Sequence, residues 1–390
     1  MFKGKFVYHQ LVSLVPRYEF NKCVTKYQGN HKVKEFYCWQ QFLLLIFGQL
    51  SYRESLRDII NCLTAHHSKV YHLGIKKVVS VSTLSRANEN RDYRIWQDFA
   101  YYLIEVSRPL YLKENDFDLN IDNTIYALDA STIDLCLSVF NWAKFRKNKG
   151  AIKLHTLLDL RGNIPVFINI TDGKVHDVQV LDLIDFEKEA FYIIDKGYYD
   201  FERLYRIHLE KAFFIIRAKS NIADRRIYSR NKDKSTGIKY DQTIKFTNKT
   251  SLEKYPEHIR KIKYYDKERN KTFIFLTNNV ETDAQIICQL YKYRWQIELF
   301  FKWIKQHLKI KSFWGESENA VKTQIWTAIC TYLLVAIAKK KCQSSLSLYE
   351  ILQILSVSPF DKTPINQLLT RSDLQKPDNP THKQLTIFDL

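Results

Sequence analysis

Thr124-Ile-Tyr-Ala-Leu-Asp-Ala130 is a short run of β-branched and aromatic residues that ends near an aspartate, and similar runs follow it. Such runs, bounded by turn residues, are typical of β-strands. The later elements are strands at 152–158 and 164–170 joined by the turn Arg161-Gly162-Asn163, a helix at 176–184, a strand at 191–195, a helix at 201–209 and a strand at 213–217. The sequence therefore predicts an α/β domain over residues 120–217.

Three antiparallel strands followed by helix, strand, helix and strand resemble the element order of a ribonuclease-H-like domain. Charged, turn-rich sequence with short alternating runs interrupts this order at 218–281 and predicts a β-rich insertion. Residues 282–342 are expected to complete the core with a long helix at about 283–309 and another at 326–340. We predict an α/β protein whose ribonuclease-H-like core is interrupted by this insertion.

The two ends of the chain have a different character. Residues 1–115 carry apolar side chains at helical spacing, as at 42–50, and predict an all-α N-terminal domain. Residues 343–390 are expected to form a C-terminal helix and a flexible tail, because Pro377, Pro380 and polar residues fill the end.

The charge balance of the chain indicates the kind of partner. The 390 residues include 60 Lys and Arg against 42 Asp and Glu, a formal net charge of +18. A surface this basic attracts polyanions, with nucleic acid the first expectation and an anionic membrane surface the second. A hydrophobic fraction of 45% excludes an intrinsically disordered chain.

The cysteines and the apolar stretches indicate a cytoplasmic protein. Seven scattered cysteines without a CxxC pair fit neither a disulfide framework nor a thiolate zinc site, and His66, His67 and His72 lack matching ligands. The basic start of the chain is not followed by the apolar segment of an export signal. The apolar stretch 325–338 is shorter than the roughly 20 residues of a membrane span. We expect a buried core helix there and no membrane partner.

Asp129 and Asp195 each stand at the end of an apolar strand. In a ribonuclease-H-like sheet these two strands are neighbours, so the carboxylates are expected to converge at one edge. Adjacent like charges are costly unless a cation neutralises them, and hard divalent cations such as Mg²⁺ bind carboxylate oxygens. The alternative is a pair of unrelated turns at strand ends.

The long helix presents charges on one face. Arg294, Glu298, Lys302 and Lys305 follow one another at spacings of four, four and three residues. An exposed salt-bridge ladder is the alternative interpretation. The surrounding aromatic residues favour a surface that stacks bases and holds phosphates; they are Tyr291, Trp295, Phe301 and Trp303.

Tyr291, Arg294, Glu298 and Lys305 together resemble the Tyr-Arg-Glu-Lys signature of the DDE transposases of bacterial insertion sequences, specifically insertion-sequence family four. The resemblance implies that Asp129, Asp195 and Glu298 form a catalytic triad holding two Mg²⁺ ions, for which Mn²⁺ can substitute. It also implies binding of terminal inverted repeats, strand cleavage through hairpinned ends, cut-and-paste strand transfer and a homodimer on DNA.

Further residues are expected to contact DNA. The resemblance implies that Tyr291, Arg294 and Lys305 hold phosphates, with Lys302 beside them and Trp295 stacked on a displaced base. A basic hairpin is predicted to follow the DNA backbone through Lys144, Arg146, Lys147, Lys149 and Lys153. In the N-terminal domain, Arg86 and Arg91 lie on a helix whose start, capped by Ser82 or Thr83, resembles the second helix of a helix-turn-helix. An ordinary solvated helix face is the alternative.

Two weaker motifs remain. His176 and Asp177 either support the metal ligands from behind or are a core histidine and a helix cap. The tail resembles a peptide that docks on the bacterial sliding clamp through Gln384, Leu385, Ile387 and Phe388, whereas a disordered amphiphilic end is the alternative.

Two other functions compete with transposition. One is a ribonuclease-H-like DNA nuclease without strand transfer, and the other is a repurposed DNA-binding protein without catalysis. The insertion and the signature helix disfavour the first, and the intact carboxylates disfavour the second.

Overall fold

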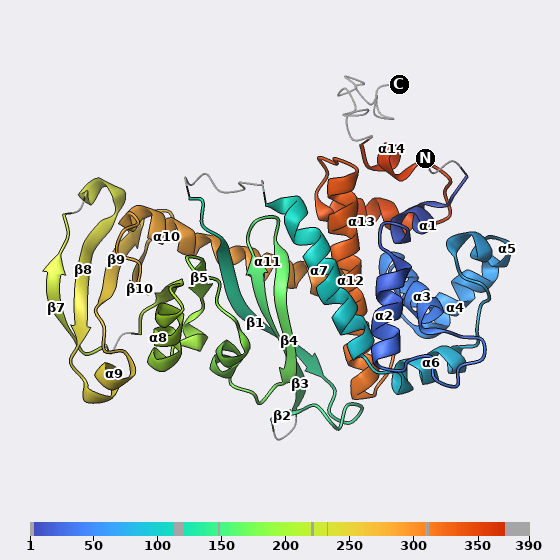
Figure 1. Cartoon of the computed structure of the whole chain (residues 1–390), viewed down its shortest axis with the longest axis horizontal. Helices are drawn as coiled ribbons and strands as arrows, with labels where there is room; N and C mark the ends of the chain where they lie inside the picture. The colour runs from blue at the N-terminus through green and yellow to red at the C-terminus, as the bar shows by residue number, and fades with distance from the viewer. Residues whose placement is uncertain are drawn as a thin grey trace, which may run out of the picture.

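The computed structural model describes residues 4–112, 121–146, 149–219, 222–231, 233–308, 310 and 312–370. Within these ranges the chain forms one large mixed sheet with helices packed on its faces and a helical layer at one end (Figure 1).

The strands of the sheet are β1 (Ile125–Leu135), β2 (Lys144–Arg146), β3 (Lys149–Asp159), β4 (Ile164–Asp172), β5 (Phe191–Ile194), β6 (Phe213–Arg217), β7 (Asp224–Ser229), β8 (Ile238–Phe246), β9 (Ile259–Asp266) and β10 (Lys271–Thr277). Short 3₁₀ helices are η1 (Tyr71–Leu73), η2 (Asp177–Leu183), η3 (Lys196–Tyr198) and η4 (Lys234–Thr236).

The α-helices before the sheet are α1 (Val7–Val12), α2 (Arg17–Lys26), α3 (Cys38–Leu50), α4 (Leu56–Ala65), α5 (His67–Val70), α6 (Val81–Asn90) and α7 (Arg94–Tyr111). Those within and after it are α8 (Phe201–Leu209), α9 (Lys249–Lys254), α10 (Ala284–Tyr293), α11 (Trp295–His307), α12 (Glu318–Lys341), α13 (Leu348–Val357) and α14 (Ile365–Thr370).

The pairing of the central strands has ribonuclease-H-like order. β3 pairs antiparallel with both β1 and β4, whereas β5 pairs in parallel with β1 on one side and with β6 on the other. Parallel neighbours cannot be joined by a tight turn. Accordingly β2, β3, β4 and η2 lie between β1 and β5, and α8 lies between β5 and β6. The predicted order of the core elements is therefore present, except that the helix expected at 176–184 is the 3₁₀ helix η2.

Alternation along β1 divides the core into two layers. Ile125 and Ala127 face the cluster formed with α7, α11 and α12, whereas Tyr126 and Leu128 face the cluster formed with α8 and η2. The sheet is covered on both faces here, so the parallel strand β5 is buried along its whole length.

The strands at 218–281 continue the central sheet. β10 pairs with β6, and β9, β8 and β7 follow in order to an exposed edge (Figure 1). The region is rich in strands, as its alternating sequence predicts. The strand hydrogen bonds continue from β6 of the core into β10 and the strands beyond it. That residues 218–281 are an insertion separate from the core therefore stays a prediction.

Helix α12 is the centre of the helical layer. It packs against α7, α3, α6 and α13, and residues from 320 to 338 along it are almost all buried. A helix enclosed on every side is apolar all round. Among the described residues, α12 is accordingly the one helix long and apolar enough to cross a membrane. Its most apolar 18-residue stretch is 94% buried inside the protein. The expected core helix at 326–340 is present but begins earlier, at Glu318.

The N-terminal helices share their core with α12. The Tyr111 hydroxyl donates to the Ala336 carbonyl at 2.9 Å, and Asn319 donates to the carbonyl of Asn88 at 2.9 Å. The described part of residues 4–112 is helical, as expected. Helix α12 belongs to the region predicted as the second part of the catalytic core, yet it packs against the N-terminal helices. The predicted boundary near residue 115 therefore does not coincide with a break in the packing.

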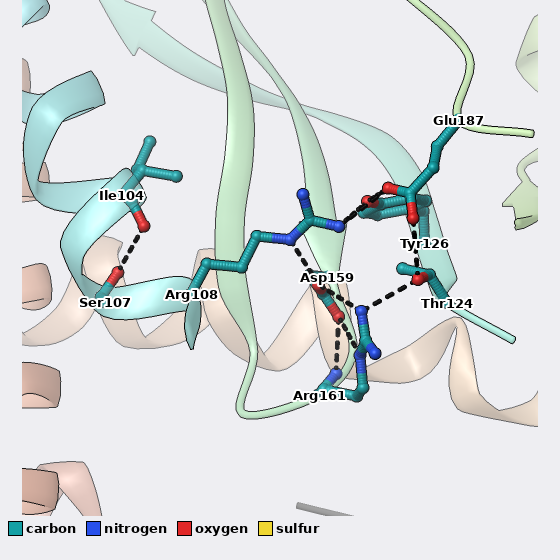
Figure 2. Close-up of polar contacts among 8 residues, drawn as sticks. All are labelled: Ile104, Ser107, Arg108, Thr124, Tyr126, Asp159, Arg161 and Glu187. Atoms are coloured by element: carbon teal, nitrogen blue, oxygen red, sulfur yellow. Dashed lines mark hydrogen bonds and ion pairs between the residues drawn. The ribbon is translucent and has the colours of Figure 1, made fainter. Parts of the chain in front are cut away.

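A network of charged side chains joins α7 to the sheet (Figure 2). Asp159, which is 1% exposed, accepts hydrogen bonds from Arg108 Nε at 3.1 Å and from the Arg161 backbone N–H at 3.0 Å. Arg108 also donates to Glu187 at 2.9 Å and to the Tyr126 hydroxyl. The network thereby fixes α7 against the start of β1 and the β3–β4 turn.

We expect Asp159→Asn to lower the free energy of unfolding by about 2 kcal/mol, because it leaves two guanidinium groups without their buried counter-charge. Glu187→Gln is the matched control within the network; its side chain is 44% exposed, and we expect a loss below about 1 kcal/mol. Urea unfolding of both variants measures the difference, and equal losses would contradict this account.

Candidate functional site

Asp129 and Asp195 lie side by side on neighbouring strands. Leu128 of β1 is opposite Ile194 of β5 in the parallel register, so the next residue on each strand is one of these aspartates. Asp129 is two residues after Ala127, and Asp195 is two residues after Ile193. Both of these earlier residues face α11, so alternation places the two carboxylates on that face of the sheet. Asp195 follows the end of β5, as predicted, whereas the expectation that Asp129 ends its strand is wrong because β1 continues to Leu135.

Glu298 reaches the same place from α11, which packs against β1 (Figure 1). The expected continuous helix at 283–309 is divided at Arg294 into α10 and α11. At this junction the Arg294 N–H donates to the Tyr291 carbonyl and the Ile297 N–H donates to the Arg294 carbonyl, both one residue tighter than in an α-helix. Arg294 thus sits at the junction with its side chain directed at the sheet.

Arg294 contacts all three carboxylates. Its Nη1 lies 2.7 Å from Asp129 Oδ2 and 3.9 Å from Asp195 Oδ1, and its Nη2 lies 2.5 Å from Glu298 Oε1. The three acidic side chains therefore come from β1, from the end of β5 and from α11, and meet around one guanidinium.

Burial dominates the electrostatics of Asp129. It raises the pKa of this carboxyl to about 6, against the lowering influence of Arg294 and of the Ala130 N–H, while Asp195 and Glu298 raise it further. The ionised form of Asp129 is therefore costly at this place, and a further cation beside the three carboxylates would stabilise their ionised forms.

The donor chemistry fits a hard divalent cation. Three carboxylates offer oxygen ligands of the kind that Mg²⁺ and Mn²⁺ bind, and all of them lie within 4 Å of a common guanidinium. In the side-chain arrangement of the described ranges, no group of three acidic, His or Cys residues is set to hold a metal ion directly. Arg294 contacts all three carboxylates in this arrangement.

The other residues of the signature helix surround this cluster. Lys305 Nζ donates to the Thr132 carbonyl of β1 at 2.6 Å and so ties α11 to the strand that carries Asp129. Tyr291 is partly buried against Phe275, with ring centroids 4.7 Å apart, and burial raises its pKa. Lys302 is exposed, and Trp295 is 53% exposed beside the cluster.

A small cavity of about 60 Å³ adjoins Trp295. Its walls include the aromatic rings of Tyr264, Phe273, Phe275 and Tyr291. The aromatic residues that sequence reasoning noted on the signature helix are thus joined by rings from β9 and β10.

Lys153 and Asp177 contact each other. Lys153 Nζ donates to Asp177 Oδ1 and to the Val175 carbonyl, both at 2.9 Å. Lys153 is opposite Thr132, three residues from Asp129, and so lies on the other face of the sheet. The Lys153 ammonium is therefore engaged within the protein, and its contact with a DNA backbone stays a prediction.

The cap predicted at Asp177 is also wrong. Asp177 is the first residue of η2, and His176 precedes it without a side-chain cap bond. The Asp177 and Asp195 carboxylates flank Gly197, each 3.6 Å from the place a Cβ would take. Support of the metal ligands by His176 and Asp177 stays a prediction.

Several predicted contacts lie outside what the structure describes. These are the side chains of Lys144, Arg146, Lys147 and Lys149 in the hairpin, and the tail residues Gln384, Leu385, Ile387 and Phe388.

The N-cap of α6 is Ser80, whose side chain accepts a hydrogen bond from the Thr83 N–H. The predicted caps, Ser82 and Thr83, are therefore wrong. Arg86 is exposed, as a DNA contact requires, but Arg91 donates to Gln41 Oε1 at 2.7 Å and to the Phe36 carbonyl. Burial lowers the pKa of Arg91. Arg91 thus stabilises the helical layer and is not a free surface cation.

A basic cleft of about 970 Å³ lies beside α6 and was missed by sequence reasoning. Its exposed cations come from two loops and from the helix; they are Lys32, Lys34, Lys76, Lys77 and Arg86. The Lys76-Lys77 doublet is visible in the sequence, but only the packing of α2, α3 and α6 brings it beside Lys32 and Lys34.

Two family descriptions match the chain. The family described as Transposase DDE domain matches residues 121–334, and Domain of unknown function (DUF4372) matches residues 3–76.

Similar proteins are transposases of bacteria. The transposase y4zB of Sinorhizobium fredii is 34% identical over 248 residues, which are 62% of this chain and 68% of that protein. The transposase for insertion sequence element IS4SA of Synechocystis is 25% identical over 271 residues, 66% of this chain and 72% of that protein. The transposase for insertion sequence element IS5377 of Geobacillus stearothermophilus is 26% identical over 219 residues, which are 56% of this chain and 57% of that protein.

Among solved structures, a piggyBac transposase synaptic complex with hairpin DNA aligns with 94% of this chain and 80% of that chain, at a TM-score of 0.44 and 10% identity.

The family match over the central sheet defines an enzyme that cleaves DNA and transfers its strands, with a ribonuclease-H-like fold and a dependence on divalent metal. The chain belongs to the DDE transposase family and is a DNA transposase of the kind found in insertion sequences. The prediction of a DNA transposase is confirmed.

His155 should make stability depend on pH. Burial, assisted by Lys153, lowers the pKa of this fully buried imidazole to about 4, with Asp177 acting in the opposite direction. The unfolded chain takes up a proton near pH 6.5 while the folded chain stays neutral, so stability falls as pH drops from 6.5 towards 4.

We expect His155 to account for about 2 kcal/mol of the loss in unfolding free energy between pH 7 and pH 5. Urea unfolding of His155→Gln at both pH values should show a correspondingly smaller loss. His31→Gln, at an exposed position, is the control and should keep the full pH dependence. An unchanged slope in His155→Gln would refute this assignment.

Proposed function

We propose that Asp129, Asp195 and Glu298 are the catalytic carboxylates of this transposase and hold two divalent ions, Mg²⁺ or Mn²⁺. The observation that carries the proposal is the meeting of all three side chains around one guanidinium, with contacts between 2.5 and 3.9 Å. Bound metal ions would activate the attacking water or 3′-hydroxyl and stabilise the leaving oxygen at phosphorus. A histidine or cysteine base is then unnecessary.

The protein's own residues position the DNA. Asp129 is fixed by the Ala130 N–H at 2.8 Å and Asp195 by the Gly197 N–H at 3.1 Å, so both ligands are oriented before substrate binds. Lys302 is exposed on the same helix as Glu298 and would contact a phosphate. Lys305 anchors that helix to β1, and Tyr291 packs α10 against Phe275 of β10.

Trp295 is proposed to stack on a base displaced from the duplex. Its indole is 53% exposed next to the aromatic cavity formed with β9 and β10. Base–aromatic stacking of this kind stabilises an unpaired nucleotide. This arrangement supports strand cleavage through hairpinned ends, followed by cut-and-paste insertion.

The finer identity of the protein follows from the signature. Tyr291, Arg294, Glu298 and Lys305 support membership of insertion-sequence family four, with terminal inverted repeats as substrate. We further propose a bacterial, nucleoid-associated protein that acts as a homodimer on DNA. Docking of the tail on the sliding clamp stays a prediction, as do the domain limits 1–115, 120–217, 218–281, 282–342 and 343–390.

A change of Asp129 to Asn tests the catalytic assignment. It should lower Mg²⁺-dependent cleavage of DNA that carries the element's ends by about a hundredfold or more, because a metal ligand is lost, while DNA binding remains. Asp134→Asn, on the same strand but exposed, is the matched control. Cleavage that survives in Asp129→Asn would overturn the assignment.

The competing nuclease is tested in the same reaction. Gel analysis for DNA ends joined to a target in Mg²⁺ separates strand transfer from hydrolysis alone. Hydrolysis without any joined product would favour the nuclease.

The basic cleft beside α6 is proposed as the DNA contact of the N-terminal helices. The cleft is lined from two loops and from α6 by the cations Lys32, Lys34, Lys76 and Arg86. Glu35 also lines it, and its carboxylate lies 4.0 Å from the Lys77 ammonium. The start of α6 also lines the cleft at Ser80. Cations gathered in one concave surface favour a sugar–phosphate backbone as ligand.

Replacing Lys32, Lys34, Lys76 and Arg86 together by Gln should weaken DNA binding and reduce its salt dependence. Each lost phosphate contact lowers the slope of log affinity against log salt by about 0.9. A variant with Gln at four scattered exposed lysines, Lys5, Lys188, Lys211 and Lys362, removes the same total charge. Filter binding over a salt series should show a smaller slope only for the cleft variant; equal slopes would exclude the cleft.

A further inference from the structure

Arg294 stands where the three carboxylates converge. Its side chain is only 17% exposed, and both terminal nitrogens are engaged, Nη1 with Asp129 at 2.7 Å and Nη2 with Glu298 at 2.5 Å. The oxygens that accept these hydrogen bonds are ones that a divalent cation would need. Arg294 and a divalent cation therefore compete for the same atoms.

The charge of Arg294 cannot be removed by a change of protonation. A guanidinium stays protonated in proteins, so its positive charge leaves the cluster only if the side chain moves away. One guanidinium balances only one of the three carboxylates in charge, and the remaining negative charge continues to attract cations. The cluster is thus held together without metal while it keeps an affinity for metal.

We propose that Arg294 is a positioning residue that holds Asp129, Asp195 and Glu298 together in the metal-free protein and leaves them when divalent cations bind. This inference rests on the proposed metal site. Once released, the guanidinium is available to a DNA phosphate, which accepts the same forked pair of hydrogen bonds as a carboxylate. Lys302 is exposed and Trp295 is half-exposed on α11, the helix that begins next to Arg294. DNA would lie on the surface that these two side chains form.

The consequence is a coupling between DNA and metal. DNA that draws Arg294 towards a phosphate removes the competitor from the carboxylates and so raises their affinity for metal. By thermodynamic reciprocity, bound metal frees Arg294 and raises the affinity for DNA. The transposase would thereby assemble its metal site most readily when DNA is already in place.

The test is a titration of the full chain with Mn²⁺, in which electron paramagnetic resonance measures the free ion. Without DNA, we expect Arg294→Gln to bind Mn²⁺ about tenfold more tightly than the unaltered protein, whereas Arg294→Lys stays close to it because the charge remains. A short DNA duplex should tighten Mn²⁺ binding to the unaltered protein, and this gain should be absent in Arg294→Gln.

Thermal unfolding provides a second readout. In EDTA, Arg294→Gln should melt at a lower temperature than the unaltered protein, because its carboxylates repel one another without a cation, and Mn²⁺ should restore the melting temperature. Lowered stability that Mn²⁺ does not restore would indicate a merely structural role and overturn the proposal.

Lys292→Gln is the matched control. Lys292 lies two residues away on α10 and pairs instead with Asp266 and Glu268, each at 3.6 Å. The substitution removes the same charge without touching the carboxylates, so Mn²⁺ affinity should stay unchanged. Equal tightening in both variants would indicate a general electrostatic effect and refute the role of Arg294, as would unchanged or weaker Mn²⁺ binding in Arg294→Gln.

Asp129→Asn separates this inference from the function beneath it. If Asp129→Asn weakens Mn²⁺ binding but Arg294→Gln does not tighten it, the metal site stands and only the role of Arg294 fails. If Asp129→Asn leaves Mn²⁺ affinity unchanged, the proposed metal site itself fails.

Discussion

The parallel pairing of β1 with β5 is the constraint on which the site depends. Leu128 opposite Ile194 puts Asp129 and Asp195 next to each other, and strict alternation along both strands directs both towards α11. A shift of one residue would send one carboxylate into the opposite apolar layer beside α8. The segments that pair here, residues 125–128 of β1 and the whole of β5, are fully buried.

Convergence of acidic side chains has a cost, and the fold offsets it locally. Burial raises the pKa of Asp129 to about 6, and Arg294 opposes that rise from the α10–α11 junction. The junction matters because it places a cation at the base of the helix that also supplies Glu298. The same short segment therefore contributes a ligand and the charge that keeps the ligands together.

The helical layer and the sheet are joined through buried contacts. Helix α12 serves as the common core of α3, α6 and α7, and the Arg108–Asp159 network fixes α7 to the strand that carries Asp129. The basic cleft beside α6 is thus attached to the carboxylate site through packed elements. This cleft is one described place where the positive charge of the chain gathers.

The sequence by itself determined the order of the elements, because strand periodicity and turn residues are local signals. From the signature at 291–305 and the two strands it also predicted the set Asp129, Asp195 and Glu298, and the fold brings these side chains together around Arg294. Tertiary structure alone decided that Arg294 lies between the carboxylates, that Lys153 and Arg91 are held internally, and that Lys32 meets Lys76 in one cleft. These outcomes depend on which distant side chains share a face or a loop cluster, and no local pattern in the chain encodes such a distance.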